Sequence, residues 1–207
     1  MAGQEVVVVT YDQGNATLSP TIPLGGLCSE ILPASEGVAY LTHSDGLARL
    51  VAAPATNQAP TLEPLLTHRD LDGVERDRDG TLYLLEHPRE EHGEPVGPHA
   101  ILRLRSSGAL DTVATASPAA YDLALDATAR RMWVTHVSGR LVESWRETDG
   151  NWRPEGTRRV DVPPASTSDA KTEPKDDAFW LARLLFLRDG HEPWLLLQGR
   201  DVKPRLI

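Results

Sequence analysis

Histidine and carboxylate side chains gather in one polar stretch of this 207-residue chain. Residues 86–99 read EHPREEHGEPVGPH, with three histidines, His87, His92 and His99, among four glutamates. Imidazole nitrogens and carboxylate oxygens are the ligands of zinc and related metals. The spacing His-x4-His-x6-His on a proline-rich loop, however, lacks the i, i+4 register by which a helix aims two imidazoles at one ion. We therefore expect a polar loop insertion with no metal and no other cofactor. A weak metal site is the less favoured alternative.

The motifs of the common enzyme classes are missing from the sequence. It contains no Gly-x-Ser-x-Gly elbow, no phosphate-binding glycine loop, no dinucleotide fingerprint and no His-Glu-x-x-His pair. The single cysteine, Cys28, precedes Ser29 and Glu30, and neither neighbour is a base suited to activating its thiol. One cysteine also excludes an intramolecular disulfide and suggests a reducing compartment.

A hydrophobic strand, a polar turn and a second strand recur five times along the chain. The five units are Val6–Leu18, Val38–Leu50, Thr81–Leu104, Met132–Val142 and Pro193–Ile207. Because a lone hairpin cannot bury its own apolar face, a hairpin repeated at about 40 residues predicts a radial or stacked β architecture. We predict an all-β fold, a small β-propeller of four or five blades of antiparallel strands, forming a single domain over residues 1–207. The N- and C-terminal strands could close the ring in a shared blade, and an open ring completed by another subunit is the alternative.

The third and fourth units show the order of strands within a unit. The third predicts strands at residues 73–77, 81–86, 100–105 and 110–114, and the fourth at 121–125, 132–136, 139–145 and 157–162. Asp-Gly and Ser-Gly between the strands predict tight turns, because glycine accepts the positive φ that such turns require. An aromatic residue recurs in the second strand of four units, at Tyr40, Tyr83, Trp133 and Trp194. We expect these rings to pack between neighbouring blades.

Two segments after the fourth unit are interpreted separately, one as a loop and one as a strand. Residues 163–177 read PPASTSDAKTEPKDD, and with no hydrophobic residue larger than alanine they predict a mobile surface loop. Residues 179–187 have helix-compatible side chains, but they stand where an inner strand is due. A strand is therefore predicted there.

The inner strands of a propeller line its central channel, so candidate ligand-binding residues come from them. They are Glu36, Glu75, Tyr121, Asp122 and Arg183. The carboxylates of Glu36, Glu75 and Asp122 come from successive units and could converge on a metal ion at the axis. The favoured interpretation is that they are polar strand ends facing water in the channel.

Three stretches within residues 35–145 carry a resemblance to a known family. They read EGVAYLTHSDGLARL, DGTLYLLEHP followed by AILRLRSSGALDTVA, and YDLALDATARRMWVTHVSGRL. These stretches resemble blades of the lactonase-type propellers, the group of gluconolactonase, regucalcin and the strictosidine-synthase-like proteins. The resemblance implies a six-bladed scaffold with a divalent cation at its axis, held by a glutamate, two asparagines and an aspartate.

The family's cation ligands map only in part onto this chain. The glutamate falls on Glu36 or Glu75, while one asparagine position is occupied by Tyr121 and Asp122. The position of the catalytic aspartate is His136. At least two of the four ligands are thus replaced, so the resemblance implies the scaffold without the catalysis.

The charge and hydropathy of the chain limit the kinds of partner that it can bind. The chain carries 30 acidic and 21 basic side chains, a net charge of −9, which disfavours nucleic acid and anionic membrane surfaces. No apolar run approaches the ~20 residues of a membrane span, and no N-terminal stretch has the features of a signal peptide. We expect a cytoplasmic protein.

These observations favour a non-catalytic binding propeller, an interaction platform for a protein or a small-molecule ligand. The partner would bind at the channel mouth and the long loops. The predicted ligand-binding residues are Glu36, Glu75, Tyr121, Asp122, His136 and Arg183. A diverged metal-dependent hydrolase or lactonase and a carbohydrate-binding, lectin-type propeller are the two alternatives.

Overall fold

The computed structural model describes residues 5–6, 8–12, 15–24, 27–35, 37–53, 58–88, 90–91, 94–95, 97–136, 141–160, 181–185, 194–199 and 202–206. Over these residues every helix or strand that forms is a β-strand. The described part of the chain accordingly holds no helix long and apolar enough to cross a membrane. The fold is all-β and built on repeated four-stranded antiparallel sheets, as predicted for a small propeller.

The chain divides into two compact units, unit 1 over Met1–Val74 and unit 2 over Glu75–Ile207. Strands β1 to β8 belong to unit 1, strands β10 to β21 belong to unit 2, and the division falls within β9. The predictions of a single domain and of a ring closed by the two chain ends stay predictions.

Unit 1 is built around one four-stranded sheet with the strand order β5-β6-β7-β8. Its strands are β1 (Glu5–Val6), β2 (Val9–Asp12), β3 (Asn15–Leu18), β4 (Ile22–Pro23), β5 (Cys28–Ser35), β6 (Val38–His43), β7 (Gly46–Val51) and β8 (Thr61–Thr67). Strand β1 pairs with β4, and β2 forms a hairpin with β3. The buried side chains of Leu24, Leu41 and Leu50 form a core against which Val6 and Ile22 pack. The N-terminal strands therefore contribute to this core.

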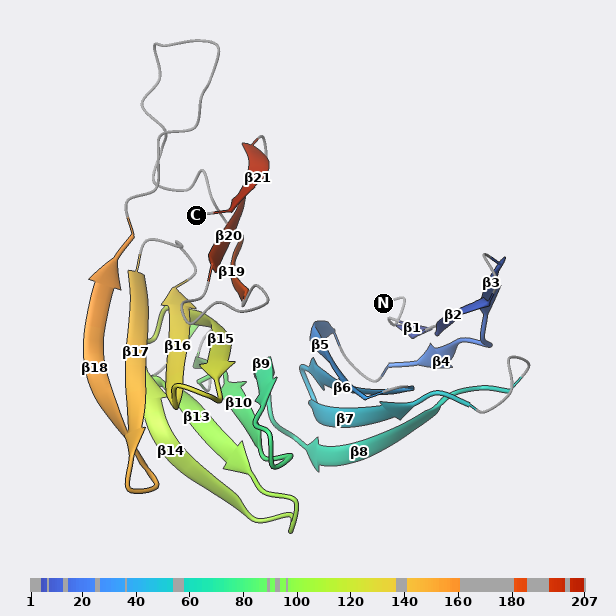
Figure 1. The fold of residues 1–207 in the computed structure, drawn as a ribbon, viewed down its shortest axis with the longest axis horizontal. Coiled ribbons are helices and arrows are strands. Elements are labelled where there is room, and N and C mark those ends of the chain that lie inside the picture. The colour runs from blue at the N-terminus through green and yellow to red at the C-terminus, as the bar shows by residue number, and fades with distance from the viewer. Residues whose placement is uncertain are drawn as a thin grey trace. The chain divides into compact units, whose positions relative to one another are not determined.

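Unit 2 contains two four-stranded sheets and one three-stranded sheet, with the orders β14-β13-β10-β9, β15-β16-β17-β18 and β19-β20-β21 (Figure 1). Their strands are β9 (Leu71–Arg76), β10 (Leu82–Glu86), β13 (His99–Leu104), β14 (Leu110–Ala116), β15 (Ala120–Asp126), β16 (Arg131–His136), β17 (Leu141–Thr148), β18 (Asn151–Arg159), β19 (Leu181–Leu185), β20 (Trp194–Gly199) and β21 (Val202–Leu206). A short hairpin of β11 (Glu90–Glu91) and β12 (Glu94–Pro95) lies between β10 and β13.

The two four-stranded sheets of unit 2 share one hydrophobic core. Leu85 and Ile101 come from the first sheet, Met132 and Val134 come from the second, and all four are fully buried. The ring of Tyr83 meets Trp152 edge to face, with the ring centroids 5.5 Å apart. Such contacts add to the burial of large aromatic surface, so this cluster fixes the two sheets against each other.

The predicted hairpins and turns are confirmed. Each of the five units contains an antiparallel pair, namely β2–β3, β6–β7, β10–β13, β16–β17 and β20–β21. The glycines of the predicted turns take positive φ, with +90° at Gly80 and +82° at Gly108. The outer strand predicted at 157–162 begins earlier, at Asn151, because Asp149 and Gly150 already turn the chain there. Residues 163–177 lie outside the described residues.

The recurrent aromatic residues occupy the predicted strands but are not equally buried. Tyr40, Tyr83, Trp133 and Trp194 all lie in the second strand of their sheets. Tyr83 is buried in the core of unit 2, whereas Tyr40 and Trp133 are only partly buried. Trp133 alternates with Met132 and Val134, so it faces away from the core that these two residues enter.

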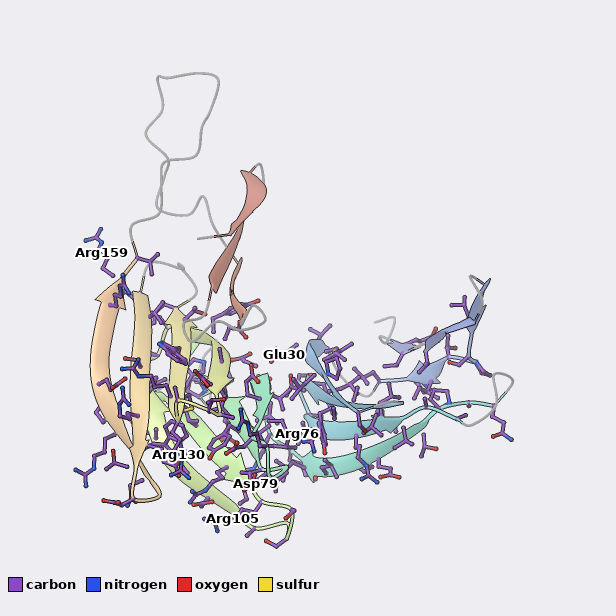
Figure 2. The ribbon with its side chains drawn as sticks, in the orientation of Figure 1. Glu30, Arg76, Asp79, Arg105, Arg130 and Arg159 are labelled. Atoms are coloured by element: carbon purple, nitrogen blue, oxygen red, sulfur yellow. The ribbon has the colours of Figure 1, made fainter. Side chains whose placement is uncertain are left out.

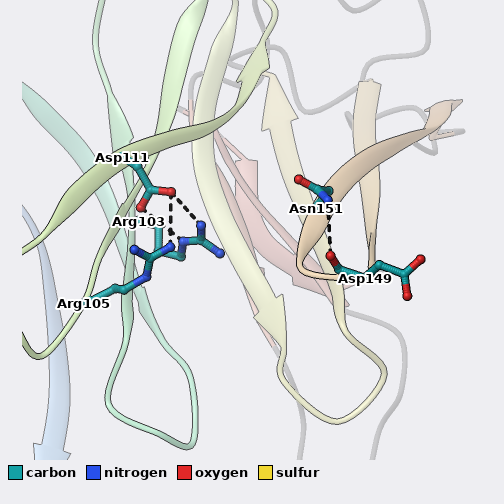
Figure 3. A network of polar contacts seen from close by, with 5 residues as sticks. All are labelled: Arg103, Arg105, Asp111, Asp149 and Asn151. Carbon is teal, nitrogen blue, oxygen red and sulfur yellow. Dashed lines mark hydrogen bonds and ion pairs between the residues drawn. The ribbon is translucent and has the colours of Figure 1, made fainter.

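An ion pair joins the neighbouring strands β13 and β14 in the first sheet of unit 2. Arg103 of β13 lies directly across from Asp111 of β14. Its guanidinium donates to both carboxylate oxygens of Asp111, at 3.2 and 2.6 Å, while Arg105 reaches the same carboxylate at 3.5 Å (Figure 3). The hydrogen bond from Arg103 lowers the pKa of Asp111 and outweighs the opposing effect of burial. This pair fixes the register of the two strands.

Candidate functional site

The two ends of the sheets in unit 2 are built differently. Residues 77–81, 105–109, 127–130 and 149–150 make short turns at one end, here called the turn end. The connections β10–β13, β14–β15 and β16–β17 leave from the opposite end, here called the loop end. Figure 2 shows Asp79, Arg105 and Arg130 at the turn end and Arg159 at the other. The longest of these connections, residues 87–98, lies at the loop end and carries its own hairpin.

Three side chains at the loop end form a buried hydrogen-bonded group, here called the Ser117–His136–Glu143 cluster. His136 Nε2 lies 2.7 Å from Glu143 Oε1 and 2.9 Å from Ser117 Oγ. The backbone N–H of Ser117 donates to the same oxygen of Glu143 at 3.1 Å. The side chains of His136 and Glu143 are 11% and 15% exposed. The cluster therefore joins three elements in a site that water hardly reaches.

Strand register explains why these residues meet. In the ladder between β16 and β17, Met132 lies across from Trp145 and Val134 lies across from Glu143. Every second residue of a strand shares a face, so His136 continues the face of Met132 and Val134, and Glu143 continues the face of Trp145. Ser117 follows β14 of the neighbouring sheet. The cluster thus covers the hydrophobic core of unit 2 at the loop end.

The contacts of His136 do not match those of a catalytic triad. A carboxylate can only accept hydrogen bonds, so His136 Nε2 carries the hydrogen and donates it to Glu143. Ser117 Oγ lies against the same nitrogen, which has no lone pair left to receive a serine proton. A triad places serine on one ring nitrogen and the carboxylate on the other. This geometry orders the loop end and does not activate Ser117.

Opposing effects act on the Glu143 carboxyl. Burial raises the pKa of Glu143, but the hydrogen bonds from His136 and Ser117 together outweigh burial, so this pKa lies below its usual range. Glu143 is thus ionised at neutral pH. A buried carboxylate with several donors is stabilised as the anion, and the loop end contains a fixed negative charge.

A histidine pair extends the polar groups of the loop end. His99, which is 1% exposed, places Nδ1 at 3.1 Å from the carbonyl oxygen of Ser117. One ring nitrogen of His99 and one of His87 lie within 4.8 Å of each other. In unit 2, these two side chains are the described residues best placed to hold a metal.

The predicted ligand-binding residues fall in several places. Glu36 lies outside the described residues, and the side chain of Arg183, in β19, does too. Glu75 lies in β9 and is partly buried. Tyr121 lies in β15, where a bulge between Ala120 and Asp122 interrupts the ladder. Their shared role in ligand binding stays a prediction.

Asp122 and His136 lie on opposite faces of their sheet. Asp122 is across from Thr135, which alternates with Val134 and His136 along β16. Asp122 is 2% exposed and Thr135 is fully buried, so this face is also covered. The structure therefore brings His136 together with Ser117 and Glu143, and separates it from Asp122.

The sequence reasoning missed Ser117 and Glu143. The signal for Glu143 was present, because the predicted strands 132–136 and 139–145 form a hairpin in which alternate residues share a face with His136. Ser117 could not be found in this way, since it lies in the connection between β14 and β15, outside this hairpin. Its contact depends on how two sheets pack, which no local pattern contains.

Comparison with known proteins identifies similar structures but no family. No family model matches the chain, and no curated protein matches it significantly. The luciferin-regenerating enzyme is similar with a TM-score of 0.55 and 15% identity, over 90% of this chain and 59% of that chain. A candidate 6-phosphogluconolactonase from Bacteroides uniformis is similar with a TM-score of 0.50 and 11% identity, over 98% and 63% of the two chains.

A third similar structure has no assigned role. This protein of unknown function from Bacteroides caccae gives a TM-score of 0.50 and 12% identity, over 100% of this chain and 73% of that chain. At these identities the likeness concerns the fold alone, which is all-β and propeller-like. The chain spans 59% of the luciferin-regenerating enzyme and 63% of the Bacteroides uniformis protein.

Proposed function

We propose that this chain is a non-catalytic binding propeller that recognises a protein or a small-molecule ligand at the loop end of its sheets. Binding residues are commonly found on long connections that a rigid scaffold positions. Residues 87–98 are such a connection, and the strands that it joins, β10 and β13, contribute Leu85 and Ile101 to the core of unit 2. The turn end, with its short connections, offers no comparable segment among the described residues.

The geometry at His136 is the observation that carries the proposal. In the lactonase-type propellers that the sequence resembles, the catalytic aspartate would stand at this position. His136 instead donates to Glu143 through the nitrogen that also contacts Ser117. A ring nitrogen that carries a hydrogen and donates it to a carboxylate has no lone pair with which to take a proton from Ser117 or a substrate. The donor set thus supports binding over hydrolysis.

A metal-dependent hydrolase or lactonase is the second candidate, and the burial of Asp122 favours it. A carboxylate that is 2% exposed on the first strand of its sheet is an unusual residue to retain. Asp122 would then be one ligand of a divalent cation, with Glu75 as another. The lectin-type alternative receives less support, since the ring of Tyr83 packs on Trp152 and offers no platform for a sugar.

Lactone hydrolysis separates the two candidates. In the presence of the full chain, glucono-δ-lactone and 6-phosphogluconolactone should hydrolyse no faster than they do without protein. Added Ca²⁺ or Mn²⁺ should not change these rates. Asp122→Asn should give the same rates. Metal-dependent turnover by the full chain that Asp122→Asn abolishes would overturn the binding assignment in favour of the hydrolase.

A binding experiment tests the loop end itself. Partners captured by the full chain are compared with those captured when residues 90–95 are replaced by a Gly-Ser segment of equal length. The matched control is Ser106→Ala with Ser107→Ala, which changes a turn at the opposite end. The proposal expects capture to fail with the first variant and to persist with the second. Capture that fails only with the control would place recognition at the turn end and contradict the proposal.

A further inference from the structure

Two histidines face each other across the base of the β10–β13 connection. In the ladder between these strands, Glu86 lies across from Ala100. The next position along the same ladder therefore sets His87 opposite His99. Residues directly across an antiparallel pair have Cβ atoms about 4.5–5.5 Å apart. This register is the strand counterpart of the i, i+4 spacing that brings two imidazoles together on a helix.

The two rings are close. Their centroids lie 5.0 Å apart with an angle of 76° between the planes, and one nitrogen of each lies within 4.8 Å of the other. Two nitrogens bound to the same tetrahedral zinc ion at about 2.0–2.1 Å are roughly 3.3 Å apart. For both nitrogens to bind one zinc ion, they would have to approach each other by at most about 1.5 Å.

Hydrogen bonds indicate which nitrogen of each ring carries the hydrogen. His87 Nδ1 lies 2.9 Å from the carbonyl oxygen of Pro88, and His99 Nδ1 lies 3.1 Å from the carbonyl oxygen of Ser117. A carbonyl oxygen can only accept, so both Nδ1 atoms carry the hydrogen. In the neutral ring the lone pair then resides on Nε2. Histidines that bind metals commonly donate their other N–H to a carbonyl in this way.

We propose that His87 and His99 form a two-histidine site for a divalent transition-metal ion of the zinc type, at the base of the β10–β13 connection. Neutral imidazole suits zinc, copper and nickel, and it is a poor ligand for calcium. Solvent or other donors complete the coordination. The ion would join the first residue of the connection, His87, to the residue that follows it, His99. It would thereby hold together the two ends of the segment to which the proposed function assigns recognition.

This site differs in its ligands from the axial cation site that the lactonase resemblance implies. That cation would be held by carboxylates and amides of inner strands, whereas His87 and His99 border the second and third strands of their sheet. The proposal also departs from the expectation of a solvated loop without metal. The departure arises because the strand pairing brings together two histidines that are far apart in the sequence.

Titration of the full chain with Zn²⁺ tests the proposal. The protein is treated with EDTA, dialysed into a non-chelating buffer near neutral pH and titrated calorimetrically. We expect saturable binding of one ion and a dissociation constant at least tenfold weaker in His87→Gln and in His99→Gln. At a hundredfold excess over the dissociation constant, Zn²⁺ should raise Tm by roughly 5–10 °C. Ca²⁺ should leave Tm unchanged.

Matched variants make the test specific. His43→Gln replaces the histidine at the end of β6 in unit 1, and His68→Gln replaces a histidine whose side chain is 89% exposed. Both should bind Zn²⁺ as the unaltered chain does. His99 is buried, so circular dichroism must show that His99→Gln keeps its β-sheet signal; if that variant does not fold, His87→Gln decides the result.

A second readout identifies the ligand atoms. With Cu²⁺, which binds such donors more tightly than zinc, electron paramagnetic resonance should show coupling to two imidazole nitrogens. The coupling should fall to one nitrogen in His87→Gln. Zn²⁺ affinity that is unchanged in His87→Gln, or the absence of saturable binding, would overturn the proposal. Neither result bears on lactone hydrolysis, so the proposed function is tested separately.

Discussion

Three histidines lie at the end of a second strand of the repeated sheets or directly after it, and their contacts differ. His43 ends β6 in unit 1, His87 follows β10 and His136 ends β16 in unit 2. His43 Nδ1 accepts a hydrogen bond from the backbone N–H of Asp45, two residues away at 3.2 Å. His136 is held instead by Glu143 and Ser117, and His87 faces His99.

The difference follows from the connection that each histidine precedes. Unit 1 returns to β7 through the two residues Ser44 and Asp45, and the hydrogen bond described for His43 Nδ1 lies within this turn. In unit 2 the connections that follow His87 and His136 are longer, and neighbouring strands bring further polar groups to the same end. Equivalent residues of the repeat therefore occupy the same place along the backbone. The contacts of each side chain depend instead on the residues that lie across from it.

Removing the carboxylate of Glu143 should have the largest effect on stability. Glu143→Ala leaves the buried N–H groups of His136 and Ser117 without their acceptor, which should cost about 3 kcal/mol of unfolding free energy. The control is Glu155→Ala, since Glu155 pairs with Arg146 and Arg131 at a more exposed place. That variant should lose less than about 1 kcal/mol. Urea denaturation measures both, and equal losses would show that the cluster is no more than a surface ion pair.

The turn after His43 should be the next most sensitive element. Gly46 has a φ of +147°, and a Cβ atom there would lie 2.0 Å from the carbonyl oxygen of Leu66. Gly46→Ala should therefore strain the backbone and displace β8. In the control Gly108→Ala, with a φ of +82° and nothing within 4 Å of the added atom, only a conformational penalty of about 1–2 kcal/mol remains. Urea denaturation should show the larger loss for Gly46→Ala, and an equal loss would mean that Leu66 moves aside freely.

Acid should weaken the cluster around His136 by a smaller amount. The pKa of Glu143 is lowered by folding, so its contribution to stability is complete above its unfolded value near 4.3. That contribution is lost as the pH falls through the lowered pKa of the folded state. The unfolding free energy of the unaltered chain should thus fall more steeply than that of Glu143→Gln from about pH 5 downward. Parallel curves for the two proteins would show that Glu143 has no folding-linked pKa change.

Strand positions in this protein follow from local patterns, and the polar contacts do not. The alternation in residues 38–50 and 132–142 and the Gly80 and Gly108 turns specify hairpins, because each hairpin is closed by residues near in sequence. The contact between Ser117 and His136 joins two sheets, so it depends on their packing. The His87–His99 pair lies between these extremes, since it needs only the register of one hairpin across a long connection.

The smallest effect should come from His43, and it completes the comparison of the three histidines. The hydrogen bond from Asp45 N–H to His43 Nδ1 is exposed, so water can replace the imidazole when it is removed. His43→Ala should therefore change the unfolding free energy by no more than about 0.5 kcal/mol. His136→Ala, by contrast, removes the closest donor to the buried Glu143 carboxylate and should cost about 1–3 kcal/mol. Urea denaturation of the two variants under identical conditions measures the difference. If His43→Ala lost as much stability as His136→Ala, position in the repeat would determine the role of the histidine, and the partners across the sheet would not.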